Sequence, residues 1–212
     1  RSVTVFDNYS TDDTREIAAA MGATVKLFGI EGQLNDQEYL KIKNNCWKGS
    51  DSDWVIVCDA DEILYHKDLL EILKRESINT ILRTQGFNCY SNHVPFETWL
   101  EIQTGIVDDN YSKSICFNPR AITEIGFVYG CHESRPQGRV KYSTEKARLL
   151  HYRAVGGVER MITRHALYRP RMAPINLRWK LGSHYQQDDG MRRADFKRRL
   201  KESVTFAEAG IM

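Results

Sequence analysis

The pattern of hydrophobic and polar positions predicts that strands and helices alternate along the first part of the chain. Short apolar runs typical of strands lie at Val3 to Phe6, at Ala23 to Phe28 and at "WVIVC" (54–58). Between them, Thr11 to Met21 and Asp36 to Lys48 have helical periodicity, and a glycine follows each segment. The unbroken run at 54–58 is of the kind that is buried on both faces of a sheet.

The pattern becomes less regular in the second part. A helix is predicted over Lys67 to Arg75 and a strand over Asn79 to Leu82, after which aromatic and proline residues indicate short strands and loops. "ARLLHY" (147–152) predicts one more strand, and two arginine-rich helical stretches end the chain. The alternation of strands and helices predicts an α/β fold with a doubly wound, mostly parallel sheet. We expect residues 1–155 to form this domain and residues 156–212 to form a basic helical segment packed on it.

Charge is distributed unevenly, although the net charge of the 212 residues is only +2. The segment from Lys141 to Lys201 contains 16 lysines and arginines but only five acidic residues. This part therefore has an excess of 11 positive charges, and the remainder of the chain has an excess of nine negative charges. Such a basic region could receive a phosphorylated ligand, an anionic membrane surface or a nucleic acid, or it could be a set of solvated helix faces. We expect no nucleic acid partner and regard peripheral membrane contact through this part as a candidate interaction.

Composition and cysteine pattern indicate a globular protein of a reducing compartment. The chain has 42% hydrophobic and 27% charged residues, and no run of about 18 apolar residues predicts a membrane span. Its five cysteines form no C-x-x-C pair, and two of them lie in apolar runs where a reduced thiol packs as a small hydrophobic group. We therefore expect a cytoplasmic protein.

The segment "DNYSTDDT" (7–14) follows the first predicted strand directly. Ser10 is the expected N-cap of the following helix, and Asp12 and Asp13 place negative charge in its first turn. Asp7 and Asn8 lie where the strand ends, and ligands of open α/β sheets bind at the carboxyl ends of strands.

A second acidic segment, "VIVCDADE" (55–62), places Asp59, Asp61 and Glu62 at the end of another strand. Clustered carboxylates repel one another unless a cation offsets their charge, and oxygen ligands suit the hard ions Mg²⁺ and Mn²⁺. Acids that cap the helix after the strand are the structural alternative. We expect a metal-diphosphate site here, with Asp61 and Asp59 as metal ligands.

These motifs together resemble the GT-A-fold glycosyltransferases of family 2. "DNYSTDDT" resembles the family's D-x-S-x-D-x-T-like motif, Lys43-Asn44 resembles its basic-Asn pair, and Asp59-Ala60-Asp61 resembles its D-x-D. The resemblance implies that Asp7, Asn8, Lys43, Asn44 and Asp59 contact the nucleotide. A uracil imide would suit an aspartate acceptor, which favours a UDP-sugar. The family has a strand and a helix before the first motif that this sequence lacks, so we expect either a truncated chain or another segment in that position.

The second half resembles one branch of these transferases through "GCHE" (130–133) and "LLHYR" (149–153). The resemblance implies that His151 is a third metal ligand, and Arg153 could bind the diphosphate with its planar guanidinium. We expect the His151 ring to lie within roughly 10 Å of the Asp61 carboxylate, a distance that one ion and small shifts could bridge. Glu133 is the first candidate for the base that removes the acceptor's proton. The reserve candidates are Glu97, Asp108 and Asp109.

The predicted function is therefore transfer of a sugar from a nucleotide diphosphate sugar to an acceptor hydroxyl, with Mn²⁺ or Mg²⁺ as cofactor. The expected acceptor is a glycan, a glycolipid or a protein. One alternative is a non-catalytic nucleotide- or glycan-binding module, including an inactive truncated transferase. Another is a metal-dependent phosphatase of the haloacid-dehalogenase type, which also places D-x-D after an apolar strand, although its motif continues differently from Glu62-Ile63.

Overall fold

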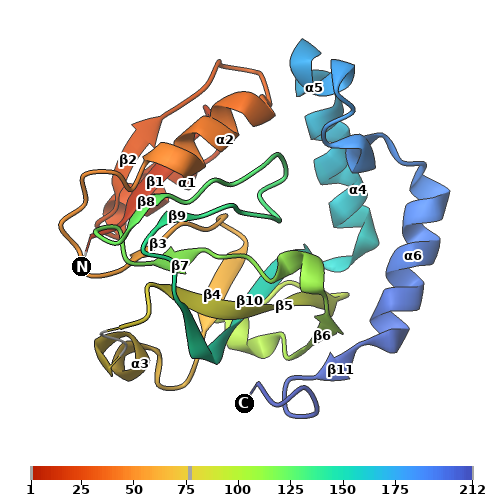
Figure 1. The fold of residues 1–212 in the computed structure, drawn as a ribbon. Coiled ribbons are helices and arrows are strands. Elements are labelled where there is room, and N and C mark those ends of the chain that lie inside the picture. Colours follow the sequence, from red (N-terminus) through yellow and green to blue (C-terminus); the bar gives the residue numbers. More distant parts are fainter. Residues whose placement is uncertain (1, 76–77, 212) are drawn as a thin grey trace.

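The computed structural model of the protein describes residues 2–75 and 78–211 and has an α/β fold with mixed sheets (Figure 1). At the N-terminal end, β1 (Thr4–Asp7) and β2 (Thr24–Leu27) are parallel and form a two-stranded sheet. They are connected by α1 (Thr14–Ala20). These three elements confirm the two predicted strands and the helix between them. α2 (Asp36–Asn45) follows, and the Asn35 side chain caps its first turn.

The predicted N-cap of the first helix is wrong. The helix begins at Thr14, and its N-cap is Asp13, whose side chain makes no capping hydrogen bond. The backbone N–H of Ser10 instead donates to Asp7 Oδ2 at 2.9 Å, which holds residues 7–10 in a turn. The helix therefore starts later than its polar sequence suggests, because the Asp7 carboxylate organises the preceding turn.

The main sheet contains two long central strands, β5 (Ile81–Ser91) and β10 (Tyr142–Val155), which are parallel to each other. β4 (Glu62–Tyr65) pairs antiparallel with β10 on one side, and β6 (Thr104–Val107) pairs antiparallel with β5 on the other. The prediction of a mostly parallel sheet is therefore wrong for the main sheet. Antiparallel neighbours need only short connections, whereas parallel neighbours need a long crossover.

The remaining strands are short. β3 (Val55–Ile56) pairs antiparallel with β7 (Cys116–Phe117), which also pairs with β5. β8 (Ile122–Glu124) and β9 (Gln137–Gly138) form a separate two-stranded sheet. β11 (Val204–Thr205) pairs with β6 at the edge of the main sheet.

The run at 54–58 is not buried on both faces as predicted. Only Val55 and Ile56 are in a strand, and the side chains of Ile56 and Cys58 are exposed while Val57 is buried. Exposed and buried side chains alternate from Ile56 to Cys58 because one face of this segment is covered and the other is open to solvent, which is common for antiparallel strands.

Two hydrophobic clusters occupy opposite sides of β10, since successive side chains of a strand point to opposite faces. Leu149 packs in a cluster with Trp47 and Phe117, whereas Leu150 packs with Phe87 and Phe206. The strand therefore lies at the centre of the molecule, and its final residues reach the region where the acidic turn lies.

The C-terminal part is mainly helical, as predicted. α4 (Gly157–Tyr168), α5 (Pro174–Arg178) and α6 (Asp189–Glu202) lie on the same side of the molecule in Figure 1, and β11 then joins the main sheet. α3 (Leu69–Arg75) lies between β4 and β5 in the sequence. Short 3₁₀ helices cover Trp99–Glu101, Asp109–Tyr111, Arg169–Arg171 and Ser183–Gln186. None of the helices in the described residues is both long and apolar enough to cross a membrane.

Candidate functional site

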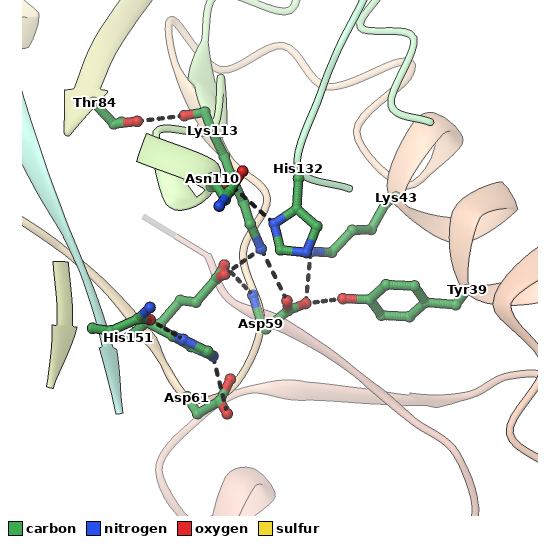
Figure 2. Close-up of polar contacts among 11 residues, drawn as sticks. Tyr39, Lys43, Asp59, Asp61, Thr84, Asn110, Lys113, His132 and His151 are labelled. Carbon is green, nitrogen blue, oxygen red and sulfur yellow. Dashed lines mark hydrogen bonds and ion pairs between the residues drawn. The ribbon is translucent and has the colours of Figure 1, made fainter. Parts of the chain in front are cut away.

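The acidic residues of the D-x-D segment lie in a tight turn between β3 and β4. The backbone N–H of Glu62 donates to the Asp59 carbonyl at 3.1 Å, which closes the turn around Ala60 and Asp61. The next helix, α3, begins only at Leu69, so these acids do not cap it. Figure 2 shows that the two aspartates face different partners.

The Asp59 carboxylate is surrounded by two lysine ammonium groups and a tyrosine hydroxyl. Its Oδ1 is 2.6 Å from Lys43 Nζ, its Oδ2 is 3.6 Å from Lys113 Nζ, and the Tyr39 hydroxyl donates to Oδ1. Burial by itself raises the pKa of this carboxyl group, but the two lysines outweigh burial and lower the pKa to about 2. Asp59 is therefore ionised at neutral pH and faces the lysines rather than Asp61.

Glu62 forms a buried ion pair with Lys113, at 2.5 Å between Oε1 and Nζ. Burial alone lowers the pKa of Lys113, but the Glu62 and Asp59 charges prevail and raise it. Glu62 Oε2 also accepts the backbone N–H of Asp59 at 3.1 Å. Lys113 thus lies within ion-pair distance of two acids of the turn, Glu62 and Asp59. Lys113 was not among the predicted site residues, although a lysine two positions before the apolar run 115–117 is a usable signal.

Asp61 pairs with His151 of β10. His151 Nε2 lies 3.6 Å from Asp61 Oδ2, which confirms the expectation that the ring and the carboxylate are close. Burial raises the pKa of Asp61, but the hydrogen bond and charge of His151 outweigh it, so the pKa is lowered. The buried imidazole also stacks on the Tyr111 ring, with 4.2 Å between the ring centroids.

A hydrogen-bond chain sets the orientation of the His151 ring. Asp108 Oδ2 accepts the side-chain N–H of Asn88 at 2.6 Å, so the Asn88 oxygen faces His151 Nδ1, at 2.7 Å. Nδ1 therefore donates to the Asn88 oxygen, and Nε2 is the ring nitrogen that faces Asp61. Asn88 was missed in the sequence, where an asparagine inside the apolar strand "GFNCY" (86–90) is the available signal.

The Asp61–His151 pair fits the ligand set of a divalent ion. Ligand bonds of about 2.0–2.2 Å place two ligands of one Mn²⁺ or Mg²⁺ ion about 3–4 Å apart, in agreement with the observed 3.6 Å. Within the described residues, no group of three or more His, Cys, Asp or Glu side chains could hold a metal. Mg²⁺ is commonly held by only one or two protein carboxylates and takes its other ligands from water and substrate phosphates, so such a site needs few protein ligands.

Arg153 lies two residues beyond His151 and faces a cluster of aromatic rings and histidines. Its Nη2 is 2.8 Å from His165 Nε2, and its guanidinium lies 5.5 Å from the centroid of the Tyr185 ring. Burial and the charge of Arg153 lower the pKa of His165 to about 3, so the imidazole is neutral and accepts this hydrogen bond. The arginine is thus held by neutral groups, and its charge is available to an anion.

The residues predicted to contact the nucleotide have partners within the protein. Asp7 is buried against the turn that it organises, and the Asn8 side chain donates to the Phe28 carbonyl at 3.1 Å. Asn44 donates to the Phe127 carbonyl at 3.0 Å and accepts the Phe127 N–H at 2.8 Å. Asn44 therefore anchors a backbone segment far along the chain, while Lys43, next to it, faces Asp59.

The candidate bases differ in how free their carboxylates are. Asp108 is occupied by Asn88 and by the backbone N–H of Asn110, which makes it a poor base. The side chains of Glu97, Asp109 and Glu133 are exposed and form no hydrogen bond or ion pair with the described residues. Glu133 follows His132, whose ring packs edge-on against Tyr111, the ring that stacks on His151.

Comparisons with known proteins add no identification. The chain matches no model of a known protein family, and a search of curated proteins gives no significant match.

Proposed function

We propose that the protein is a metal-dependent glycosyltransferase that moves a sugar from a nucleotide diphosphate sugar, preferably a UDP-sugar, to an acceptor hydroxyl of a glycan, glycolipid or protein. The observation that carries the proposal is the Asp61–His151 pair, in which an oriented imidazole and a carboxylate lie 3.6 Å apart at the end of the D-x-D turn. The three sequence motifs that resemble the GT-A transferases support it.

Each of the site residues has a role that follows from its surroundings. Asp61 and His151 would hold Mn²⁺ or Mg²⁺, which when bound neutralises the diphosphate and makes it a better leaving group. Arg153, held by neutral groups, contributes a guanidinium for the diphosphate oxygens. Lys43 and Lys113 keep Asp59 ionised and fix the turn.

Glu133 is the proposed base. Its carboxylate accepts the proton of the acceptor hydroxyl as the hydroxyl oxygen bonds to the anomeric carbon of the donor sugar, and the bond from that carbon to the diphosphate breaks. Its exposure leaves room for an acceptor to approach.

Calorimetric titration with UDP tests the proposal. UDP should bind in the presence of Mn²⁺, and the affinity should fall at least about tenfold in excess chelator or in Asp61→Ala, because the diphosphate would then face an incomplete site. Asp51→Ala removes an exposed carboxylate outside the site and should leave the affinity unchanged. Equal affinity with and without chelator would contradict the proposal. UDP binding without hydrolysis or transfer of any sugar donor would favour the binding module.

A further inference from the structure

A pocket of about 320 Å³ lies beside Asp61 and has no role in the site described above. We call it the Trp99 pocket. It lies between the D-x-D turn, the segment before Trp99, the end of β10 and the first turns of α4. Of the residues predicted to bind the nucleotide or metal, only Asp61 lines it. A ligand in this pocket would therefore meet the donor site at Asp61 and nowhere else.

Two arginines of α4 give the pocket a positive charge. Arg160 and Arg164 are four residues apart, so both project from the same face of the helix into the pocket. Arg164 Nη2 donates to the Arg153 carbonyl at 2.6 Å, which fixes its guanidinium. Neither arginine forms an ion pair with a carboxylate of the described residues, and the acid in the pocket lining, Asp61, is engaged by His151. The pocket thus has an excess of positive charge.

The opposite wall of the pocket is aromatic and apolar. The rings of Trp99 and Tyr152 meet edge-on, with 6.1 Å between their centroids, and both line the pocket. Aromatic faces suit the C–H surface of a sugar ring, while a guanidinium binds carboxylate or phosphate oxygens in a planar, two-pronged geometry. Ligand pockets commonly combine an apolar lining with a few charged groups that set orientation.

We propose that the Trp99 pocket binds the acceptor and that the acceptor is a sugar carrying a carboxylate or phosphate group. The proposal rests on the proposed transferase function, because it places the acceptor beside the metal-binding Asp61. Arg160 and Arg164 hold the anionic group, and Trp99 and Tyr152 contact the ring. The charged group, not the sugar ring alone, determines which acceptor binds.

The test uses the Trp99 indole as a local reporter of pocket occupancy. The full chain is labelled with ¹⁵N-tryptophan, and Trp99→Phe assigns the indole N–H signal of Trp99 among those of the four tryptophans. Glucuronate, glucose 6-phosphate and glucose are titrated in turn in the presence of Mg²⁺. The two charged sugars should shift the Trp99 signal at concentrations at least about tenfold lower than glucose, since one charge-assisted interaction contributes on the order of 1.4 kcal/mol or more.

Three variants test whether the two pocket arginines, rather than the overall positive charge of the protein, bind the charged sugars. Arg160→Met and Arg164→Met should each weaken the binding of the charged sugars at least about tenfold and leave glucose unaffected. Arg178→Met removes the same charge from an exposed position of α5 outside the pocket and should change nothing. Equal binding of glucose and the charged sugars, or unchanged binding in both pocket variants, would overturn the proposal.

UDP distinguishes the acceptor from the donor diphosphate. A shift of the Trp99 signal by UDP that disappears in Arg160→Met and Arg164→Met would show that the arginines hold the donor, and the proposal would fail. Calorimetry with UDP on the same samples reports on the donor site. If UDP does not bind but the charged sugars still shift the Trp99 signal, the transferase function fails while the ligand class of the pocket stands.

Discussion

At the scale of single residues, the acids of the D-x-D turn have different properties because they have different partners. Asp59 and Glu62 are neutralised by lysines within the protein, whereas Asp61 is next to an imidazole. A buried carboxylate without a nearby cation would be costly, so each partner determines whether its acid is structural or open to a ligand.

The pKa of Asp59 predicts a loss of stability in acid. Its value is 3.8 in a model peptide and about 2 in the folded protein, so the unfolded chain binds more protons between these values. Above pH 3.8, the ionised Asp59 carboxylate therefore stabilises the folded protein by about 2 kcal/mol. This stabilisation is lost as the pH falls toward 2. Urea unfolding across this window should show a shallower pH dependence in Asp59→Asn. Identical slopes in the two proteins would refute the assignment.

Removal of Lys113 should destabilise the fold strongly. Lys113→Met leaves Glu62, which is only 5% exposed, without its cation, and breaking a buried pair in this way costs about 3–5 kcal/mol. The free energy of unfolding from urea titrations measures the effect. Lys197→Met, at an exposed position of α6, should change it by less than about 0.5 kcal/mol. Adding Glu62→Gln to Lys113→Met should recover part of the loss, because no buried charge then remains at Glu62.

At the scale of elements, α2 is connected to the segment that precedes the candidate base. Asn44, in the last turn of α2, makes two hydrogen bonds to the backbone of Phe127, which is 83 residues away in the sequence. The helix thereby positions both Lys43 for Asp59 and the chain that leads to Glu133.

Two neighbouring asparagines provide a matched test of this connection. Asn44→Ala should lower the free energy of unfolding by about 1–3 kcal/mol, because it leaves the Phe127 backbone groups without partners. Asn45 is exposed and donates only to Lys41 of its own helix, so Asn45→Ala should have an effect below about 0.5 kcal/mol. Similar losses in the two variants, measured by urea unfolding, would mean that helix propensity rather than the Phe127 contact is responsible.

At the scale of the whole molecule, the last residues complete the core beneath the main sheet. Phe206 is 1% exposed and packs edge-on against Phe87 of β5, with 5.3 Å between the ring centroids. β11, directly before it, pairs with β6. Residues 156–211 are therefore part of the same packed structure as the central strands and are not only a surface layer of basic helices.

The variant Phe206→Ala tests how strongly the C-terminal residues stabilise the folded protein. The cavity and the lost apolar contacts predict a decrease of about 3–5 kcal/mol in the free energy of unfolding. Phe96→Ala removes a ring that is 92% exposed and should leave this free energy nearly unchanged. Thermal and urea unfolding both report the difference. A Phe206→Ala variant as stable as Phe96→Ala would show that the end of the chain does not contribute to the core.

The sequence by itself determined the local elements and the positions of the acidic turn and His151. Helical and strand periodicities are local properties, so β1, α1, β2, α2 and α3 were predicted close to their observed bounds. The expectation that His151 lies near Asp61 was also confirmed: β4, which begins directly after Asp61, pairs antiparallel with β10 and places Glu62 opposite His151.

Only the tertiary structure decided the strand directions, the partners of the acids and the Trp99 pocket. The main sheet is mostly antiparallel because pairing depends on how the connections pack, which periodicity does not encode. Lys113 meets Glu62 across 51 residues and Asn88 meets His151 across 63, so no local pattern could pair them. The Trp99 pocket likewise assembles from segments that are distant in sequence, because their side chains meet only when the chain is folded.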